Sequence, residues 1–315
     1  MSGVGMDCPD ERVWSVWGSV SCRTLEVISG KSVRLEHADS ASVDFWCRVF
    51  GVPADVFTGV LASLPPSRHR LVAAYDGARL VSTVQVYCMD IGVRGESARP
   101  WGCIANVATD PEYRSRGIAS LLMRNANEVM RDEFRCECGL LFTGSHSFYE
   151  SLGWANVHGR VLHASFTGAS IADFGPVDLD ITAMSKVYDR WGLTGPVQVI
   201  RDALAWEHRV GPRLAKKTIF LADQAYAVLD KWDQKVAILE MAGEGNAVAE
   251  LVRNALSWYS KGEPVFVYSD MECPPELIGM LSNVEFETVI SGMIKGVLAQ
   301  PPNLENFRTA GEDHF

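Results

Sequence analysis

The sequence predicts two α/β domains in tandem, each with a mixed central sheet flanked by helices, the second a degenerate copy of the first. Three observations support this. The chain has 315 residues, the size of one large domain or of two with about 100–150 residues each. Apolar strands alternate with amphipathic helices in the first half. The second half then repeats the order of strand pair, helix and strand.

Turn and cap residues separate the elements expected in the first half. Asp39 or Ser40 is a helix cap, Pro65-Pro66 ends a helix, and Asp76-Gly77 forms the turn of a hairpin. The expected strands are residues 32–36, 69–75, 79–89, 101–109, 139–143 and 156–166, and the expected helices are residues 40–50, 53–64, 117–134 and 148–152.

The second half follows a loop over residues 168–176. Its expected helices are residues 177–191, 198–210, 247–260 and 275–281, and its expected strands are residues 218–221, 225–229, 236–241, 265–268 and 288–297. This reading divides the chain into a flexible N-terminal arm (1–22), a first domain (23–167), a second domain (168–298) and a flexible tail (299–315).

Composition restricts the classes of partner. The formal net charge is −10, which argues against a nucleic-acid partner, because phosphate backbones need a basic face. The same charge is compatible with a cationic substrate such as an amine. Eight scattered cysteines lack the spacing of a zinc site, so we expect no metal and a reducing compartment.

The chain also lacks the sequence features of a membrane or secreted protein. No apolar run approaches the roughly 20 residues that span a bilayer. The N-terminus lacks a basic segment followed by a continuous apolar core, so it does not resemble a signal peptide. We therefore expect a cytoplasmic protein without a membrane partner.

A segment from Asn106 to Met130 has the pattern of an anion site. An apolar strand is followed by a turn at Asp110-Pro111, and Arg114-Ser115-Arg116-Gly117-Ile118-Ala119 then leads into an amphipathic helix. Free N–H groups and the helix dipole favour an anion at a helix start, and arginines add bidentate hydrogen bonds. Two solvated arginines would be the alternative reading, but the strand before and the helix after favour a phosphate cradle.

A second segment extends the pattern. Leu140-Leu141-Phe142 reads as the next strand, and SHSFYESLGW follows from Ser145 to Trp154. Together the two segments resemble the GCN5-related N-acetyltransferase (GNAT) superfamily, whose members bind the acetyl-CoA pyrophosphate on a [QR]-x-x-G-x-[GA] turn and carry a tyrosine shortly before a Gly-aromatic pair. This resemblance covers residues 33–160 and implies that residues 23–167 bind acetyl-CoA.

Further details resemble one branch, the enhanced-intracellular-survival (Eis) type tandem acetyltransferases. They are FYESLGW, Tyr188-Asp189-Arg190, Arg201-Asp202, Trp206-Glu207 and Arg209. The resemblance covers residues 33–298 and does not include the third, sterol-carrier-like domain of that branch. In the second half, the equivalent turn Gly243-Glu244-Gly245-Asn246 has no arginine, and Glu244 would repel a phosphate. We therefore expect the second half to be non-catalytic and to form one wall of the substrate cleft.

The resemblance implies a role for each matching residue. Val107 and Thr109 would form main-chain hydrogen bonds with the pantetheine arm, and the N–H near Val107 would polarise the thioester carbonyl. Tyr149 would protonate the leaving thiolate as general acid. The remaining residues expected to bind the cofactor are Arg114, Ser115, Arg116, Gly117, Ile118, Ala119 and Phe148.

The general base is not determined by the sequence. The strand 101–109 has no acidic residue before Asp110. His146, which precedes Tyr149 and has an unperturbed pKa of about 6.5, is one candidate. Asp90 and Glu96 are others, and the C-terminal carboxylate of Phe315 is a further one, by analogy with some Eis-type relatives.

These features together predict a function. The chain is expected to be an acetyl-CoA-dependent N-acetyltransferase in which a primary amine, on a small molecule or a lysine side chain, attacks directly in a ternary complex. The alternatives are a non-catalytic CoA-binding sensor or scaffold, and an acyltransferase that uses a longer acyl-CoA or a hydroxyl acceptor. Because Eis-type relatives commonly oligomerise, a homo-oligomer is a further hypothesis.

Overall fold

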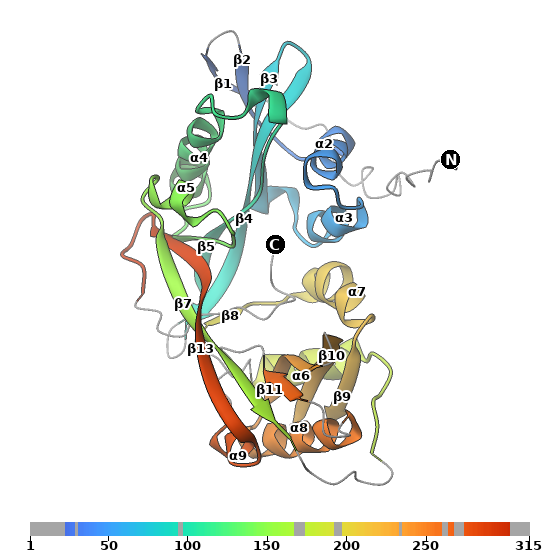
Figure 1. The fold of residues 1–315 in the computed structure, drawn as a ribbon. Helices are drawn as coiled ribbons and strands as arrows, with labels where there is room; N and C mark the ends of the chain where they lie inside the picture. The colour runs from blue at the N-terminus through green and yellow to red at the C-terminus, as the bar shows by residue number, and fades with distance from the viewer. Residues whose placement is uncertain are drawn as a thin grey trace, which may run out of the picture.

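A single mixed sheet organises the described part of the chain (Figure 1). The computed structural model describes residues 23–28, 31–93, 97–166, 174–191, 197–232, 235–259, 264–267 and 274–302. The N-terminal arm predicted over residues 1–22 lies outside these ranges, as do residues 303–315 of the predicted tail. Within the described ranges, no helix is long and apolar enough to cross a membrane.

The elements of the first half follow the predicted order. Helix α2 has the predicted bounds, and the predicted helix 117–134 is a helix continued by a π-helical turn at Val129–Glu133. The bounds are β1 Arg23–Ile28, β2 Lys31–Glu36, α2 Ser40–Phe50, α3 Asp55–Ala62, β3 His69–Asp76, β4 Arg79–Val93, β5 Arg99–Thr109, α4 Ile118–Glu128, β6 Cys138–Leu141, α5 His146–Glu150 and β7 Ala155–Ser165.

The second half repeats this alternation with one departure. Its bounds are α6 Ile181–Trp191, β8 Val197–Val199, a π-helical turn Ala205–Val210, α7 Gly211–Leu214, β9 Thr218–Ala222, β10 Ala225–Trp232, β11 Lys235–Gly243, α8 Gly245–Tyr259, β12 Pro264–Val267, α9 Pro275–Ile278 and β13 Ser282–Gly296. The predicted helix 198–210 is wrong at its start, because residues 197–199 form β8, which pairs with the end of β4. The two β-branched side chains of β8 are buried there beside Ile91 and Trp101.

Local signals explain the elements that were predicted well. Asp39 caps α2 by accepting a hydrogen bond from the Ser42 N–H at 2.9 Å, and Gly51 ends the helix in the left-handed conformation. The buried side of α2 includes Val43 and Trp46, which pack on β3.

The strand order joins the two halves. It runs β1-β2-β3-β4-β5-β6-β13-β7-β12-β11-β10-β9. Strand β13 of the second half therefore lies between β6 and β7 of the first, and β7 lies between β13 and β12. Figure 1 shows β7 and β13 as two long strands that run side by side between the upper and lower parts of the molecule.

The pairing pattern is repeated in the two halves. In the first half an antiparallel pair, β4–β5, is followed by α4 and by a strand parallel to β5, namely β6. In the second half the antiparallel pair β10–β11 is followed by α8 and by β12, parallel to β11. This repeat is compatible with a tandem duplication. The division at residue 167 stays a prediction, and the two predicted domains share one sheet.

Helices cover both faces of the first part of the sheet. One core cluster lies under α4 and contains Leu122 and Met123 together with β-strand side chains such as Val84 and Val86. A second cluster lies under α2 and α3 on the other face, around Trp46. The fold is thus mixed α/β, with a large mixed sheet flanked by helices, and β5 lies between two helical layers.

Candidate functional site

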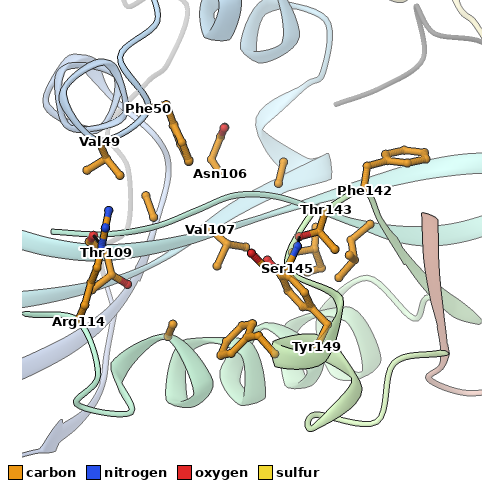
Figure 2. A pocket seen from close by; sticks show the side chains of 16 residues that line it. Val49, Phe50, Asn106, Val107, Thr109, Arg114, Phe142, Thr143, Ser145 and Tyr149 are labelled. Carbon is orange, nitrogen blue, oxygen red and sulfur yellow. Dashed lines mark hydrogen bonds between the residues drawn. The ribbon is translucent and has the colours of Figure 1, made fainter. Parts of the chain in front are cut away.

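A cleft opens where β5 and β6 separate. Their parallel pairing runs from Trp101 opposite Cys138 to Ile104 opposite Leu141, where β6 ends, while β5 continues to Thr109. The cleft beside this part of β5 has a volume of about 520 Å³. Its lining residues are Val49, Phe50, Ile104, Ala105, Asn106, Val107, Ala108, Thr109, Arg114, Ala119, Leu141, Phe142, Thr143, Ser145, Phe148 and Tyr149 (Figure 2).

A β-bulge at Asn106 shapes the middle of the cleft. The register between β4 and β5 shifts between Thr83 and Gln85, and Asn106 has a φ of 47°. The left-handed region is unfavourable for a residue with a Cβ, although asparagine tolerates it better than most. The bulge turns Asn106 to the α2 side of β5 and Val107 to the α4 side (Figure 2).

A chain of buried hydrogen bonds holds the bulge. The Trp46 indole Nε1–H donates to the Thr83 hydroxyl (2.9 Å), and this hydroxyl donates to the Asn106 carbonyl (2.8 Å). The Asn106 side-chain amide donates to Gln85 Oε1 (2.6 Å). Because Trp46, Thr83 and Gln85 are buried, these bonds fix the main chain of β5 from the side of α2. Asn106 is not among the site residues predicted from the sequence, although an asparagine within an apolar strand is a residue type that tolerates the left-handed conformation of such a bulge.

The predicted anion turn lies at one end of the cleft. Ser115 (φ 57°) and Gly117 (φ 73°) are both in the left-handed conformation, and Gly117 precedes the first residue of α4 without a side-chain cap. A Cβ on Gly117 would meet nothing within 4 Å, so the backbone conformation, not space, favours glycine here. The N–H groups of the first turn of α4, which have no intrahelical acceptor, are therefore available to an anion.

The two arginines of the turn are held differently. Arg114 lines the cleft and donates from Nε to the Thr109 carbonyl at 3.2 Å. Arg116 is exposed, lies over the Tyr113 ring and donates to the Glu112 carbonyl at 2.7 Å. Ser115 and Gly117 are exposed, and Ile118 and Ala119 are half-buried at the start of α4. The turn thus offers two guanidinium groups and open backbone N–H groups to a phosphate.

Tyr149 lies at the other end of the cleft, on α5. Its side chain is 7% exposed, and burial raises the pKa of Tyr149 to about 12, although a hydrogen bond with Thr143 acts in the opposite direction. The Phe148 ring packs edge-to-face against it, with centroids 4.9 Å apart. The phenol is therefore protonated at neutral pH and faces the cleft, as a proton donor requires.

The described candidates for the general base are less well placed for catalysis than Tyr149 is for its role as proton donor. His146 is the first residue of α5, half-buried, and is not one of the residues that line the cleft. Asp90 forms an ion pair with Arg68 at 2.8 Å, and this partner lowers the pKa of Asp90. Glu96 and Phe315 lie outside the described residues. The role of His146 stays a prediction.

Two residues of the second half that the sequence singled out, Arg201 and Glu244, form hydrogen bonds within that half. Arg201 is buried and forms an ion pair with Glu240 at 2.7 Å, beside the rings of Tyr188 and Trp206. In the second-half turn, the Glu244 carboxylate accepts from the Ala247 N–H at 3.1 Å, at the start of α8. A carboxylate thus lies where a phosphate would bind in the first half.

Comparisons with known proteins agree with this geometry. Residues 35–157 match the family model described as an acetyltransferase (GNAT) domain. No curated protein matches the chain.

Solved structures are similar over most of the chain. A GCN5-related N-acetyltransferase from Kribbella flavida has a TM-score of 0.65 at 18% identity and covers 85% of this chain and 72% of its own. Eis1 from Mycobacterium abscessus has a TM-score of 0.63 at 13% identity, with 89% and 74% covered. N-myristoyltransferase from Saccharomyces cerevisiae, solved with bound myristoyl-CoA, has a TM-score of 0.51 at 12% identity, with 85% of each chain covered.

These similarities at low identity concern the fold. The domain match falls on the part of the chain that contains the cleft, the anion turn and Tyr149. The chain therefore contains an acetyltransferase (GNAT) domain over residues 35–157, and its fold is similar to that of solved GCN5-related N-acetyltransferases.

Proposed function

We propose that the protein transfers an acetyl group from acetyl-CoA to a primary amine. The GNAT fold supports acyl-CoA-dependent acyl transfer in general. The observation that carries the finer proposal is the arrangement of the cleft. One continuous cavity joins Arg114, at the anion turn, to the buried phenol of Tyr149 along an edge of β5 that no longer pairs with β6.

The cleft offers complementary groups to each part of acetyl-CoA. The turn from Arg114 to Ala119 would bind the pyrophosphate through backbone N–H groups and guanidinium groups. The main chain of β5 at Val107 and Thr109 would form hydrogen bonds with the pantetheine arm, as a neighbouring strand would. The ring of Phe148, which also lines the cleft, would pack against this arm.

The chemistry follows from these positions. The amine nitrogen attacks the thioester carbonyl carbon, and the negative charge that develops on the carbonyl oxygen is stabilised by a main-chain N–H near Val107, a contribution of about 3 kcal/mol. The carbon–sulfur bond then breaks, and Tyr149 donates its proton to the leaving thiolate. The nitrogen loses a proton to solvent water, the Tyr149 phenolate takes a proton back from solvent, and the products are an amide and CoA. No covalent enzyme intermediate is required.

The proposal is tested by measuring thiol release from acetyl-CoA against a panel of amines, with the acetylated product identified by mass spectrometry. We expect thiol release that depends on one class of amine. Acetyl-CoA binding without thiol release on any amine would contradict the transferase and favour a CoA-responsive sensor or scaffold.

A longer acyl group is the second candidate. The lining at Ile104, Leu141 and Phe142 is apolar, and the yeast enzyme of similar fold was solved with myristoyl-CoA. Comparing acetyl-, octanoyl- and myristoyl-CoA with one amine distinguishes the two. If kcat/KM is higher for octanoyl-CoA or myristoyl-CoA than for acetyl-CoA, the longer acyl-CoA is the donor and the acetyl-CoA proposal is wrong.

A further inference from the structure

Two apolar side chains line the part of the cleft that faces α2, beside the polar Asn106. Val49 and Phe50, at the C-terminal end of α2, lie on the same side of β5 as Asn106, while Val107 and Tyr149 lie on the other side (Figure 2). Phe50 is 43% exposed, so its ring is accessible to a molecule that enters the cleft. If acetyl-CoA follows the α4 side of β5, an acceptor enters from the α2 side and meets Phe50.

The lining carries little charge. Ten of the sixteen lining residues are apolar, five are uncharged and polar, and Arg114 is the remaining one. Arg114 lies at the anion turn, where it contacts the Thr109 carbonyl. Among the described residues that form this cleft there is thus no carboxylate, so the net charge of −10 is carried elsewhere on the molecule.

This lining discriminates between kinds of amine. A polyamine or an aminoglycoside carries several ammonium groups, and each loses hydration when it enters a cleft whose described lining has no carboxylate to replace the water. An amine on an apolar body instead buries that body against Phe50 and Val49, which is favourable. Loss of hydration in the cleft also lowers the pKa of an ammonium group and so favours the neutral nucleophile. This effect reduces the need for a strong base.

We propose that the acceptor is a primary monoamine on an aromatic or branched aliphatic body, and that Phe50 contacts this body. The inference rests on the proposed N-acetyltransferase function. The reaction is the one described above: the nitrogen forms a bond to the acetyl carbon, the bond from carbon to sulfur breaks, and the sulfur takes the proton of Tyr149. The specificity therefore comes from the α2 side of the cleft, and the acyl chemistry from the α4 side.

The first test compares substrates on the full chain. Thiol release is measured with acetyl-CoA and 2-phenylethylamine, 1,4-diaminobutane or an aminoglycoside. We expect kcat/KM for 2-phenylethylamine to exceed the other two by at least about tenfold. A higher kcat/KM for either polycation overturns the inference but leaves the transferase intact. Bound acetyl-CoA with no thiol release on any amine contradicts the proposed function itself.

The second test changes the cleft. Phe50→Ala should raise KM for 2-phenylethylamine about tenfold and leave KM for acetyl-CoA nearly unchanged. Phe286→Ala is the matched control, because Phe286 is an aromatic residue on β13 with a similar exposure of 47% and does not line the cleft. An equal loss with all amines for Phe50→Ala would show that Phe50 supports the fold and does not contact the acceptor.

A third variant adds a carboxylate to the α2 side of the cleft. Val49→Glu should raise kcat/KM for 1,4-diaminobutane relative to 2-phenylethylamine at least about tenfold, because the new carboxylate pairs with the distal ammonium. If this variant has a lowered melting temperature, Phe50→Glu provides the same test at the more exposed position. An unchanged ratio in a folded variant would overturn the inference.

Discussion

At the scale of single residues, Asn106 determines the path of β5 through the site. Its backbone lies in the left-handed region, and its carbonyl and side-chain amide are bonded to Thr83 and Gln85 on β4. Few residue types satisfy both demands. Asparagine accepts the backbone conformation and supplies the amide, whereas glycine would supply only the conformation.

The backbone conformation at Asn106 makes a prediction about stability. Both Asn106→Ala and Asn106→Gly lose the hydrogen bond to Gln85, but only alanine is strained at a φ of 47°. We therefore expect the free energy of unfolding of Asn106→Ala to be about 1 kcal/mol lower than that of Asn106→Gly, measured by urea titration. An alanine variant as stable as the glycine variant would contradict the left-handed backbone conformation at Asn106. In ordinary strands alanine is the more stable of the two.

Tyr149 makes a prediction about pH. A phenol donates its proton only below its pKa, and burial raises the pKa of Tyr149 to about 12. The rate should therefore rise as the acceptor amine loses its proton and show no alkaline decrease up to about pH 11. Initial rates of thiol release, corrected for spontaneous hydrolysis, give this profile. An alkaline decrease near pH 9 to 10 that is absent in Tyr149→Phe would show that the phenol has an ordinary pKa.

At the scale of elements, the start of α4 is the predicted phosphate site. Open N–H groups of the first turn, two left-handed residues and two arginines meet there. Arg116 is held over Tyr113 and so is already partly ordered before a ligand binds. Ordering before binding reduces the entropy lost when a phosphate is bound.

Removing both arginines should weaken CoA binding. We expect the double variant Arg114→Ala, Arg116→Ala to raise the Kd for CoA at least about tenfold, and the remaining affinity to depend less on salt, because charge-assisted hydrogen bonds are lost. Isothermal titration calorimetry measures both. Arg124→Ala with Arg131→Ala is the control with the same change in charge, on exposed residues of α4 and its π-helical turn. Equal affinities in the two double variants would exclude the turn as the phosphate site.

The elements also show what the sequence can predict. Helix α2 and the hairpin of β3 and β4 were predicted closely, because Asp39, Gly51 and Asp76-Gly77 are local signals. Strand β8 was misread as helix, because its partner on β4 is about 100 residues away in the sequence. The anion turn and Tyr149 could be predicted from a motif. The hydrogen-bond chain from Trp46 to Asn106 could not, because it depends on contacts between distant segments.

At the scale of the whole molecule, strands of the two halves pair with one another in one sheet. Strand β13 completes the sheet of the first half between β6 and β7, and β7 continues that sheet to β12 of the second half. The local periodicity of residues 288–297 predicts a strand but not its neighbours. The pairing of β13 with β6 and β7 therefore could not be predicted from the sequence, whereas the division into two domains stays a prediction.

The shared sheet makes a prediction about unfolding. Because unfolding either half removes strand partners from the other, we expect one cooperative transition in differential scanning calorimetry, with equal calorimetric and van't Hoff enthalpies. Two resolved transitions would contradict mutual dependence of the halves. Dissociation of an oligomer would make the melting temperature depend on protein concentration. Light scattering at the same concentration therefore tests the hypothesis of a homo-oligomer.

Acyl transfer in the cleft beside β5, as we propose it, depends on Tyr149 as the proton donor. The most direct measurement compares the rate of thiol release from acetyl-CoA, in the presence of an accepted amine, between the wild type and Tyr149→Phe, with acetyl-CoA affinity measured on the same samples. Our account predicts that kcat falls about 10²- to 10⁴-fold while the affinity is nearly unchanged. An unchanged kcat in the phenylalanine variant would contradict it.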